Sequence, residues 1–215
     1  MPSPIRIDLR DDGADLEPLV AALSAGRVVV LPTDTVYGLA AAAHLPGACA
    51  RVAQLKGRDP GQPTALVAGS VETLFATVLP ELHGRAGPLA TRLLPGPTTV
   101  IVPNPGRRFR WVCGPTPEKL GLRVPDLDPR VAAAIDRIGA VVATSANAHG
   151  GPDPGTLDEV PAELLAQVAV AVDAGRLPGT PSTVVDLTGR EPVVLREGAL
   201  STGDVLGRLA LTESR

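Results

Sequence analysis

Short runs of β-branched and aliphatic residues recur along this chain, and segments with helical periodicity separate them. The run Val28-Val29-Val30-Leu31 is followed by Pro32, which is typical of a buried strand that ends at a proline. Strands that alternate with helices favour an α/β fold, in which helices pack against a sheet. The predicted strands are 28–31, 64–68, 98–102, 120–124, 140–143, 168–172, 183–186 and 193–195.

Helices are predicted between these strands from apolar residues spaced three and four positions apart. The first has its apolar face over residues 16–23, with Asp11 or Asp12 as the expected cap and Gly26 as the expected end. Gly87-Pro88 is expected to break the helical segment 80–94 into two pieces. The other predicted helices are 47–55, 129–138 and 202–209.

The scarcity of aromatic residues limits what the core can contain. They make up 2% of the 215 residues, so the core has to be built from Ala, Val, Leu and Ile. The length suits one α/β domain with a sizeable core or two small domains. The 23 prolines and 23 glycines are scattered and form no linker. One domain is therefore the simplest prediction.

Charge and cysteine content disfavour several classes of protein. The formal net charge is −3 and the sequence pI is about 5.6, so no global field attracts nucleic acid and RNA would need a local basic patch. Cys49 and Cys113 show no metal-binding spacing and are expected to be reduced, buried thiols. We find no secretory signal and no apolar run of membrane length, so we predict a cytoplasmic protein with no membrane partner.

Lys56 is notable because this chain strongly prefers arginine. Of the 20 basic residues, only Lys56 and Lys119 are lysines. The tripeptide Lys56-Gly57-Arg58 places a compact ammonium beside a planar guanidinium, a combination that suits phosphate oxygens. The alternative is a solvated helix end whose cations complement the helix dipole.

A polar turn follows the first predicted strand. Thr33, Thr35 and Tyr37 place three hydroxyls within five residues, and Gly38 allows close approach of the backbone to a ligand. Because open α/β sheets bind ligands at the carboxyl ends of strands, we interpret the turn as a cradle for a small hydroxylated or zwitterionic substrate. The alternative is a turn whose threonines satisfy local backbone groups.

Other predicted strands also carry polar residues. Ser145 and Asn147 can present a hydroxyl and an amide to one ligand, unless they only form a local turn. Ser182 and Arg196 could reach one pocket if their strands pair; the alternative is an ordinary hairpin with an exposed ion pair. Arg123 is a lone charge in an apolar strand, so it lies at an edge or faces inward beside a carboxylate, which a substrate could supply.

In this order the motifs resemble those of one family, the YrdC-like threonylcarbamoyl-AMP synthases. Any one motif is modest evidence, but seven in one order are specific. The resemblance covers residues 10–200, and residues 1–9 and 201–215 are expected to be terminal extensions that pack on the same domain. The matching segments are Pro32–Leu39, Lys56–Arg58, Pro95–Thr99, Arg123–Pro125, Thr144–Asn147, Ser182–Asp186 and Arg196–Gly198.

The resemblance implies a twisted mixed β-sheet flanked by helices, with a large concave cavity. It implies a nucleotidyltransferase that joins L-threonine, bicarbonate and ATP into threonylcarbamoyl-AMP and releases pyrophosphate. Mg²⁺ would accompany the nucleotide, and no metal held by protein residues is predicted. A transferase complex would then move the threonylcarbamoyl group to the adenosine beside the anticodon of tRNA.

The resemblance also assigns roles to the residues singled out above. A carbamate oxygen has to attack the α-phosphorus of ATP, which requires charge neutralisation and alignment more than a protein nucleophile. Lys56 and Arg58 are therefore the expected catalytic residues. The expected ATP-binding residues are Lys56, Arg58, Ser145, Asn147 and Arg196. The expected threonine-binding residues are Thr33, Thr35, Tyr37, Arg123 and Ser182.

Two other functions are compatible with these motifs. A paralogue with the same cavity could make another acyl-adenylate, such as carbamoyl-adenylate, although the maturation proteins that do so are much longer chains. A double-stranded RNA-binding module is the other alternative, supported by the basic and aromatic residues at 107–111. That segment could equally be a solvated loop entering a strand.

Overall fold

The computed structural model describes residues 3–59, 61–78, 82, 84–148 and 150–210. Its strands are β1 (Ile5–Asp8), β2 (Val29–Pro32), β3 (Tyr37–Ala42), β4 (Ala65–Val67), β5 (Thr98–Pro103), β6 (Lys119–Arg123), β7 (Val141–Ser145), β8 (Val170–Asp173), β9 (Thr183–Asp186) and β10 (Val193–Arg196). Its α-helices are α1 (Glu17–Ser24), α2 (Pro46–Lys56), α3 (Val71–Thr73), α4 (Ala86–Leu93), α5 (Pro129–Ile138), α6 (Ala162–Leu165) and α7 (Thr202–Ala210).

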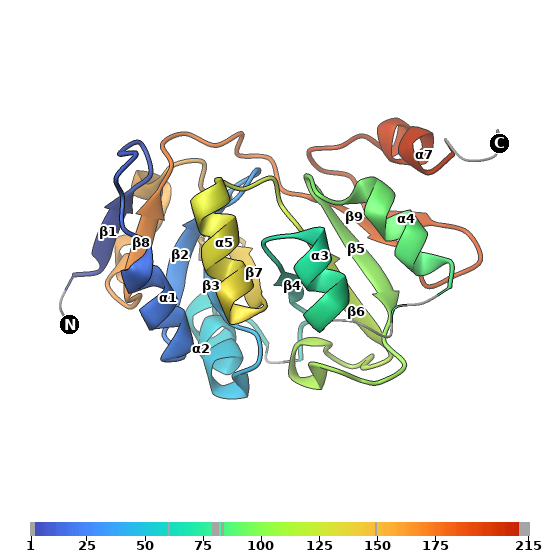
Figure 1. The fold of residues 1–215 in the computed structure, drawn as a ribbon, viewed down its shortest axis with the longest axis horizontal. Helices are drawn as coiled ribbons and strands as arrows, with labels where there is room; N and C mark the ends of the chain where they lie inside the picture. Colours follow the sequence, from blue (N-terminus) through green and yellow to red (C-terminus); the bar gives the residue numbers. More distant parts are fainter. Residues whose placement is uncertain (1–2, 60, 79–81, 83, 149, 211–215) are drawn as a thin grey trace.

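All ten strands belong to one mixed sheet, with parallel and antiparallel neighbours. The order is β1-β8-β2-β3-β7-β4-β6-β5-β9-β10. Figure 1 shows α1, α5, α3 and α4 crossing the sheet in this view, with β1 and α7 on opposite sides of the molecule. The predicted single α/β domain is confirmed, and Cys49 and Cys113 are buried free thiols. No helix in the described part of the chain is long and apolar enough to cross a membrane.

The eight predicted strands all form, with ends within two residues of the predicted bounds. Two strands were not predicted, β1 and β3. The sequence of β3, YGLAAA, has no β-branched residue, and its alanines favour a helix in isolation. All six residues are nevertheless buried, between β2 on one side and β7 on the other. Pairing within the sheet overrides the local preference here.

The predicted start of the first helix was wrong. Neither Asp11 nor Asp12 caps α1, which begins at Glu17 with Pro18 in its first turn. The fixed φ of proline and its missing N–H suit that position. The carboxylate of Asp11 instead accepts the backbone N–H of Gly13 in its own turn, at 2.9 Å.

The predicted break at Gly87-Pro88 was also wrong. Helix α4 runs through both residues. Pro88 is the third residue of this helix, where a backbone N–H has no partner inside the helix and its absence costs little. A π-helix covers Leu74–Val78 before it. The first predicted piece of the 80–94 segment includes residues 80, 81 and 83, which lie outside the described residues.

Alternation along the central strands gives the sheet a filled face and a hollow face. Leu66, Leu122 and Val100 lie in register on β4, β6 and β5, are fully buried, and belong to the core cluster that includes α4. On the other face the side chains at the centre of the sheet are small. Ala65 pairs with Ala143 of β7 and lies beside Gly121 of β6. These small residues leave space for a cavity.

Both terminal segments pack on the domain within the described residues. Strand β1 pairs in parallel with β8 at one edge of the sheet. Helix α7 packs against α4, with Val205 and Leu209 buried. Arg92 of α4 donates a hydrogen bond to the carbonyl of Leu209 at 2.7 Å. The last residues, 211–215, lie outside the described part.

Candidate active site

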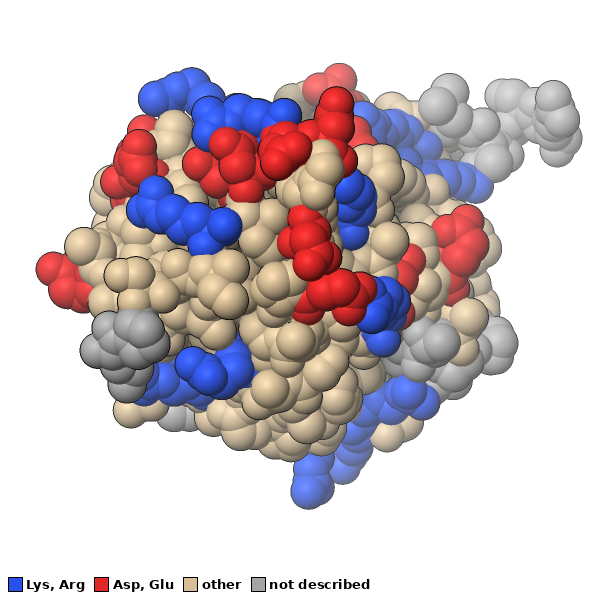
Figure 2. All heavy atoms as spheres, turned by 60° about the vertical axis from the view of Figure 1, so that its left-hand side comes forward, with Lys and Arg blue, Asp and Glu red and all other residues tan. Residues whose placement is uncertain are grey.

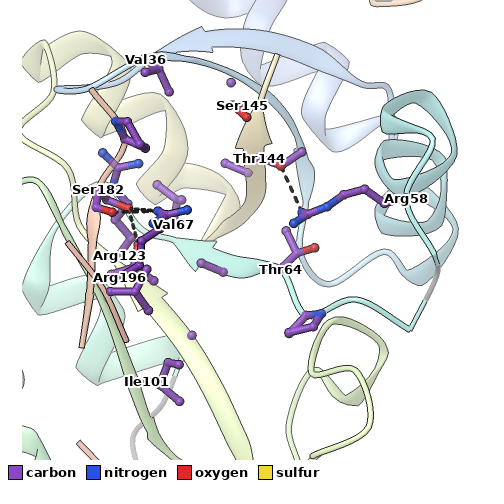
Figure 3. A pocket seen from close by; sticks show the side chains of 18 of the residues that line it. Val36, Arg58, Thr64, Val67, Ile101, Arg123, Thr144, Ser145, Ser182 and Arg196 are labelled. Carbon is purple, nitrogen blue, oxygen red and sulfur yellow. Dashed lines mark hydrogen bonds between the residues drawn. The ribbon is translucent and has the colours of Figure 1, made fainter. Parts of the chain in front are cut away.

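A cavity of about 470 Å³ opens on the hollow face of the sheet. Figure 3 shows Arg58 on one side of it and Ser182, Arg123 and Arg196 on the opposite side, with Ser145 between. Segments that are far apart in the sequence thus meet in one hollow. Eight of the ten predicted site residues line it: Thr33, Lys56, Arg58, Arg123, Ser145, Asn147, Ser182 and Arg196.

Lys56 is held at the cavity wall by three acceptors. It is the last residue of α2, and Gly57 follows in the left-handed conformation, with φ of 65°, which turns the chain out of the helix. Its ammonium donates to the carbonyl and hydroxyl oxygens of Ser145, at 2.8 and 3.1 Å, and to the side-chain oxygen of Asn147. Burial lowers the pKa of Lys56 to about 8, so its charge is sensitive to its surroundings.

Arg58 and Arg196 face each other across the cavity with no carboxylate bound to either guanidinium among the described residues. Arg58 donates to Thr144 Oγ1 at 3.2 Å and to Gln62 Oε1 at 3.0 Å. Burial lowers the pKa of Arg58, and the positive charge of Arg196 lowers it further. An anion placed between the two guanidiniums would relieve this repulsion.

The predicted pairing that brings Arg196 to Ser182 is confirmed. Strands β9 and β10 are antiparallel, and the register shifts between Val194 and Arg196. Such a bulge re-aims the side chain that follows it. Arg196 donates to the carbonyl oxygen of Ser182 at 2.7 Å, and the Ser182 hydroxyl lies 2.9 Å from that of Thr99.

Arg123 faces inward, but its partner is a residue of the protein itself. It donates to the carboxylate of Asp34 and to Thr35 Oγ1, the latter at 2.6 Å. The side chains of Arg123 and Asp34 are each only 11% exposed. Burial lowers the pKa of Arg123, while the Asp34 carboxylate opposes that shift. Asp34 was not predicted as a site residue, although it lies inside the motif that carries Thr33 and Thr35.

Thr35 and Tyr37 do not line the cavity. Thr35 is fully buried and links the hydroxyl of Thr33, at 2.9 Å, to Arg123. The Tyr37 hydroxyl donates to the carbonyl of Gly175 at 2.7 Å, and burial raises the pKa of Tyr37 to about 12. Thr33 itself lines the cavity, and its hydroxyl also bonds backbone groups of the turn. Both interpretations of the turn therefore apply: its threonines bond local groups, and Thr33 also faces the cavity.

Asp153 lines the cavity, although no sequence motif indicated it as a site residue. Its carboxylate accepts a hydrogen bond from the side-chain amide of Asn147 at 3.2 Å. Lys119 also lines the cavity, and its ammonium pairs with Asp186 at 2.9 Å. The rarity of lysine could have indicated Lys119 as well as Lys56.

The basic and aromatic segment 107–111 lies outside the cavity lining. The rings of Phe109 and Trp111 pack edge to face with centroids 5.8 Å apart, and the Trp111 indole donates to the carbonyl of Ala43 at 3.0 Å. Arg107 pairs with Glu118 at 2.8 Å. On the face of the molecule in Figure 2, acidic and basic side chains are interspersed, and no patch of one sign dominates.

Comparison with known proteins identifies close relatives. Residues 21–198 match the family model that joins Sua5, YciO and YrdC, described as "Telomere recombination". A protein of Alkalilimnicola ehrlichii named threonylcarbamoyl-AMP synthase is 36% identical over 179 residues, which covers 82% of this chain and 87% of the relative.

Solved structures share the fold. The crystal structure of P. abyssi Sua5 complexed with L-threonine matches with a TM-score of 0.77 and 26% identity, covering 96% of this chain and 60% of that chain. The structure of E. coli YciO matches with a TM-score of 0.79 and 25% identity, covering 94% and 98%. The chain therefore belongs to the Sua5/YciO/YrdC family.

Proposed function

We propose that this protein is a threonylcarbamoyl-AMP synthase, which makes threonylcarbamoyl-AMP and pyrophosphate from L-threonine, bicarbonate and ATP. The chain belongs to this family, and the observation that carries the proposal is the excess of positive charge on its cavity wall. Five basic residues and one acidic residue, Asp153, line the cavity among the described residues. The basic residues are Lys56, Arg58, Lys119, Arg123 and Arg196.

We place the triphosphate between Arg58 and Arg196. These guanidiniums lie on opposite sides of the cavity, and the positive charge of Arg196 lowers the pKa of Arg58, so an anion between them is favourable (Figure 3). Bidentate guanidinium contacts suit phosphate oxygens. Lys56 adds positive charge from the wall, where its three acceptors fix its position. Ser145 and Asn147 would orient the nucleotide and the carbamate.

We place threonine beside Arg123. Its guanidinium is anchored on one side by Asp34 and suits a carboxylate on its other side. The hydroxyls of Thr33 and Ser182 line the same cavity and would meet the polar groups of the amino acid. Thr35 and Tyr37 would support the site without lining it, because Thr35 accepts a hydrogen bond from Arg123 and Tyr37 anchors the turn to Gly175.

The proposed chemistry needs alignment and charge neutralisation. The threonine amine combines with bicarbonate to give a carbamate and water, and a carbamate oxygen then attacks the α-phosphorus of ATP while pyrophosphate leaves. Fixed cations stabilise the charge that develops on the phosphate oxygens. The apolar side chains of Val36, Val67 and Ile101 also line the cavity and limit the water that could hydrolyse a carbamate.

Mg²⁺ would arrive with the nucleotide. Over the described residues, no group of three or more His, Cys, Asp and Glu residues could hold a metal ion. The product would pass to a transferase complex that modifies tRNA, and we therefore expect the reaction in the cytoplasm. Direct RNA binding is not needed for the adenylate-forming step.

The proposal is tested by incubating the purified protein with Mg²⁺, ATP, bicarbonate and L-threonine and detecting the adenylate by mass. We expect threonylcarbamoyl-AMP and pyrophosphate only when all three substrates are present. An adenylate that forms from carbamoyl phosphate without threonine would favour the paralogue instead. Salt-sensitive RNA binding with no pyrophosphate release in any mixture would favour the RNA-binding module.

A further inference from the structure

Asp153 stands apart because it is the one carboxylate among the described residues that line a cavity rich in cations. It lies in the loop that follows β7. A carboxylate repels a triphosphate that binds beside it. A favourable contact of Asp153 would offset this repulsion. Its carboxylate accepts a hydrogen bond from the side-chain amide of Asn147, at 3.2 Å.

The contacts of Asn147 show what that bond does. Its amide nitrogen donates to the carbonyl of Gly151 and to Asp153, so both amide hydrogens have acceptors. Its amide oxygen is thereby turned the other way, where it accepts from the Ser145 hydroxyl at 2.7 Å and from the Lys56 ammonium. If the amide rotated by half a turn, its nitrogen would face the ammonium, a contact between two donors.

We propose that Asp153 is a positioning residue for adenylate formation: its carboxylate fixes the amide of Asn147, whose oxygen holds the ammonium of Lys56. The chain of contacts runs from Asp153 through Asn147 to Lys56 without a gap. The catalytic consequence rests on the proposed function, but the contacts themselves do not.

The charges around Lys56 support the same assignment. Among the described residues, Asp153 from the loop after β7 and Arg58 from the segment after α2 are the charged groups that act on this ammonium. Burial lowers the pKa of Lys56 to about 8, the Asp153 carboxylate raises it, and Arg58 lowers it. Without the carboxylate, burial and Arg58 act unopposed, and the ammonium loses its proton closer to neutral pH.

The rarity of lysine makes a direct measurement possible. Lys56 and Lys119 are the only lysines, so lysine labelled with ¹³C at Cε gives two side-chain NMR signals. A Lys119→Arg variant of the full chain assigns them. The test variant is Asp153→Asn, which removes the charge and keeps the shape. Asp153→Glu restores the charge, and Asp158→Asn is the matched control, because Asp158 is exposed and outside the lining.

We expect Lys56 to titrate near pH 8 in the unmodified protein and in Asp158→Asn, about one pH unit lower in Asp153→Asn, and near its original value in Asp153→Glu. The pH above which kcat/KM for ATP falls should move by the same amount. An unchanged Lys56 titration in a folded Asp153→Asn protein overturns the proposal, as does an Asp153→Glu protein that behaves like Asp153→Asn. If the unmodified protein makes no adenylate, the proposed function fails, while the NMR titration still decides the role of Asp153.

Discussion

The guanidinium of Arg123, on β6, is bound to the carboxylate of Asp34 in the turn between β2 and β3, although 89 residues separate them in the sequence. Both side chains are 11% exposed. The other oxygen of Asp34 accepts the backbone N–H of Asp126 at 3.1 Å. The pair therefore joins the polar turn to the strand that crosses the cavity floor, and it fixes the side chain proposed to bind the threonine carboxylate.

Asp34→Asn should be strongly destabilising. It leaves the buried guanidinium of Arg123 without its counter-charge, and breaking such a pair costs about 3 kcal/mol. Urea unfolding measures the loss, and KM for threonine should rise. The control is Asp8→Asn, which breaks an exposed pair with Arg10 and should change the stability much less, because solvent screens surface pairs. Equal losses for the two variants would contradict a special role for the buried pair.

Arg58→Ala should disable the enzyme and spare the fold. Among the described residues its guanidinium donates hydrogen bonds to Thr144 and Gln62 only, so the free energy of unfolding should change by less than about 1 kcal/mol. Loss of a charge-assisted phosphate contact should lower kcat/KM for ATP about 100-fold or more. Arg51→Ala, which removes an arginine bound to two glutamines outside the cavity, is the control. Comparable ATP kinetics in both variants would rule out the assigned phosphate contact.

Gly198→Ala should displace Ser182 and Arg196 together. A Cβ at residue 198 would lie 2.2 Å from the carbonyl oxygen of Pro181 and 2.7 Å from that of Ser182, so the backbone has to shift. We expect at least about a tenfold loss of kcat/KM and a loss of about 1–3 kcal/mol in stability. Gly189→Ala, in the turn between β9 and β10, meets nothing closer than 3.5 Å and should be nearly neutral. A fully active Gly198→Ala protein would show that this close packing is unimportant.

Activity should fall above pH 8 because Lys56 then loses its charge. Its ammonium form is present below its pKa of about 8, and each further pH unit removes about nine-tenths of what is left. We expect kcat/KM for ATP to decline with this pKa in the unmodified protein. Lys56→Arg keeps the charge at all these pH values, so any activity it retains should lack the decline. Dividing the two profiles removes the titration of the substrates, and a flat ratio to pH 9.5 would contradict the assignment.

The secondary structure was predicted correctly where it depends on residues that are close together in the sequence. Strand β9 was predicted with its observed bounds because its residues are β-branched, and α5 because its apolar spacing is regular. Strand β3 was missed because six residues without β-branching become a strand only between two neighbouring strands. Elements whose formation depends on residues nearby in the sequence were therefore predicted, and β3, whose formation depends on pairing within the sheet, was not.

The site shows the same division. The motifs indicated Lys56, Arg58 and Arg196, which line one cavity. Asp34 and Asp153 were not indicated, because an acidic residue gives no sign in the sequence of which cation or amide it will meet. Tyr37 was expected to bind threonine, but its hydroxyl anchors the turn to residues near the end of β8.

The most direct test is a crystal structure of the protein with L-threonine and a non-hydrolysable ATP analogue bound together. We predict phosphate oxygens between Arg58 and Arg196 and the threonine carboxylate at Arg123, with both ligands in the one cavity. A nucleotide bound elsewhere, or two ligands in separate cavities, would contradict the account.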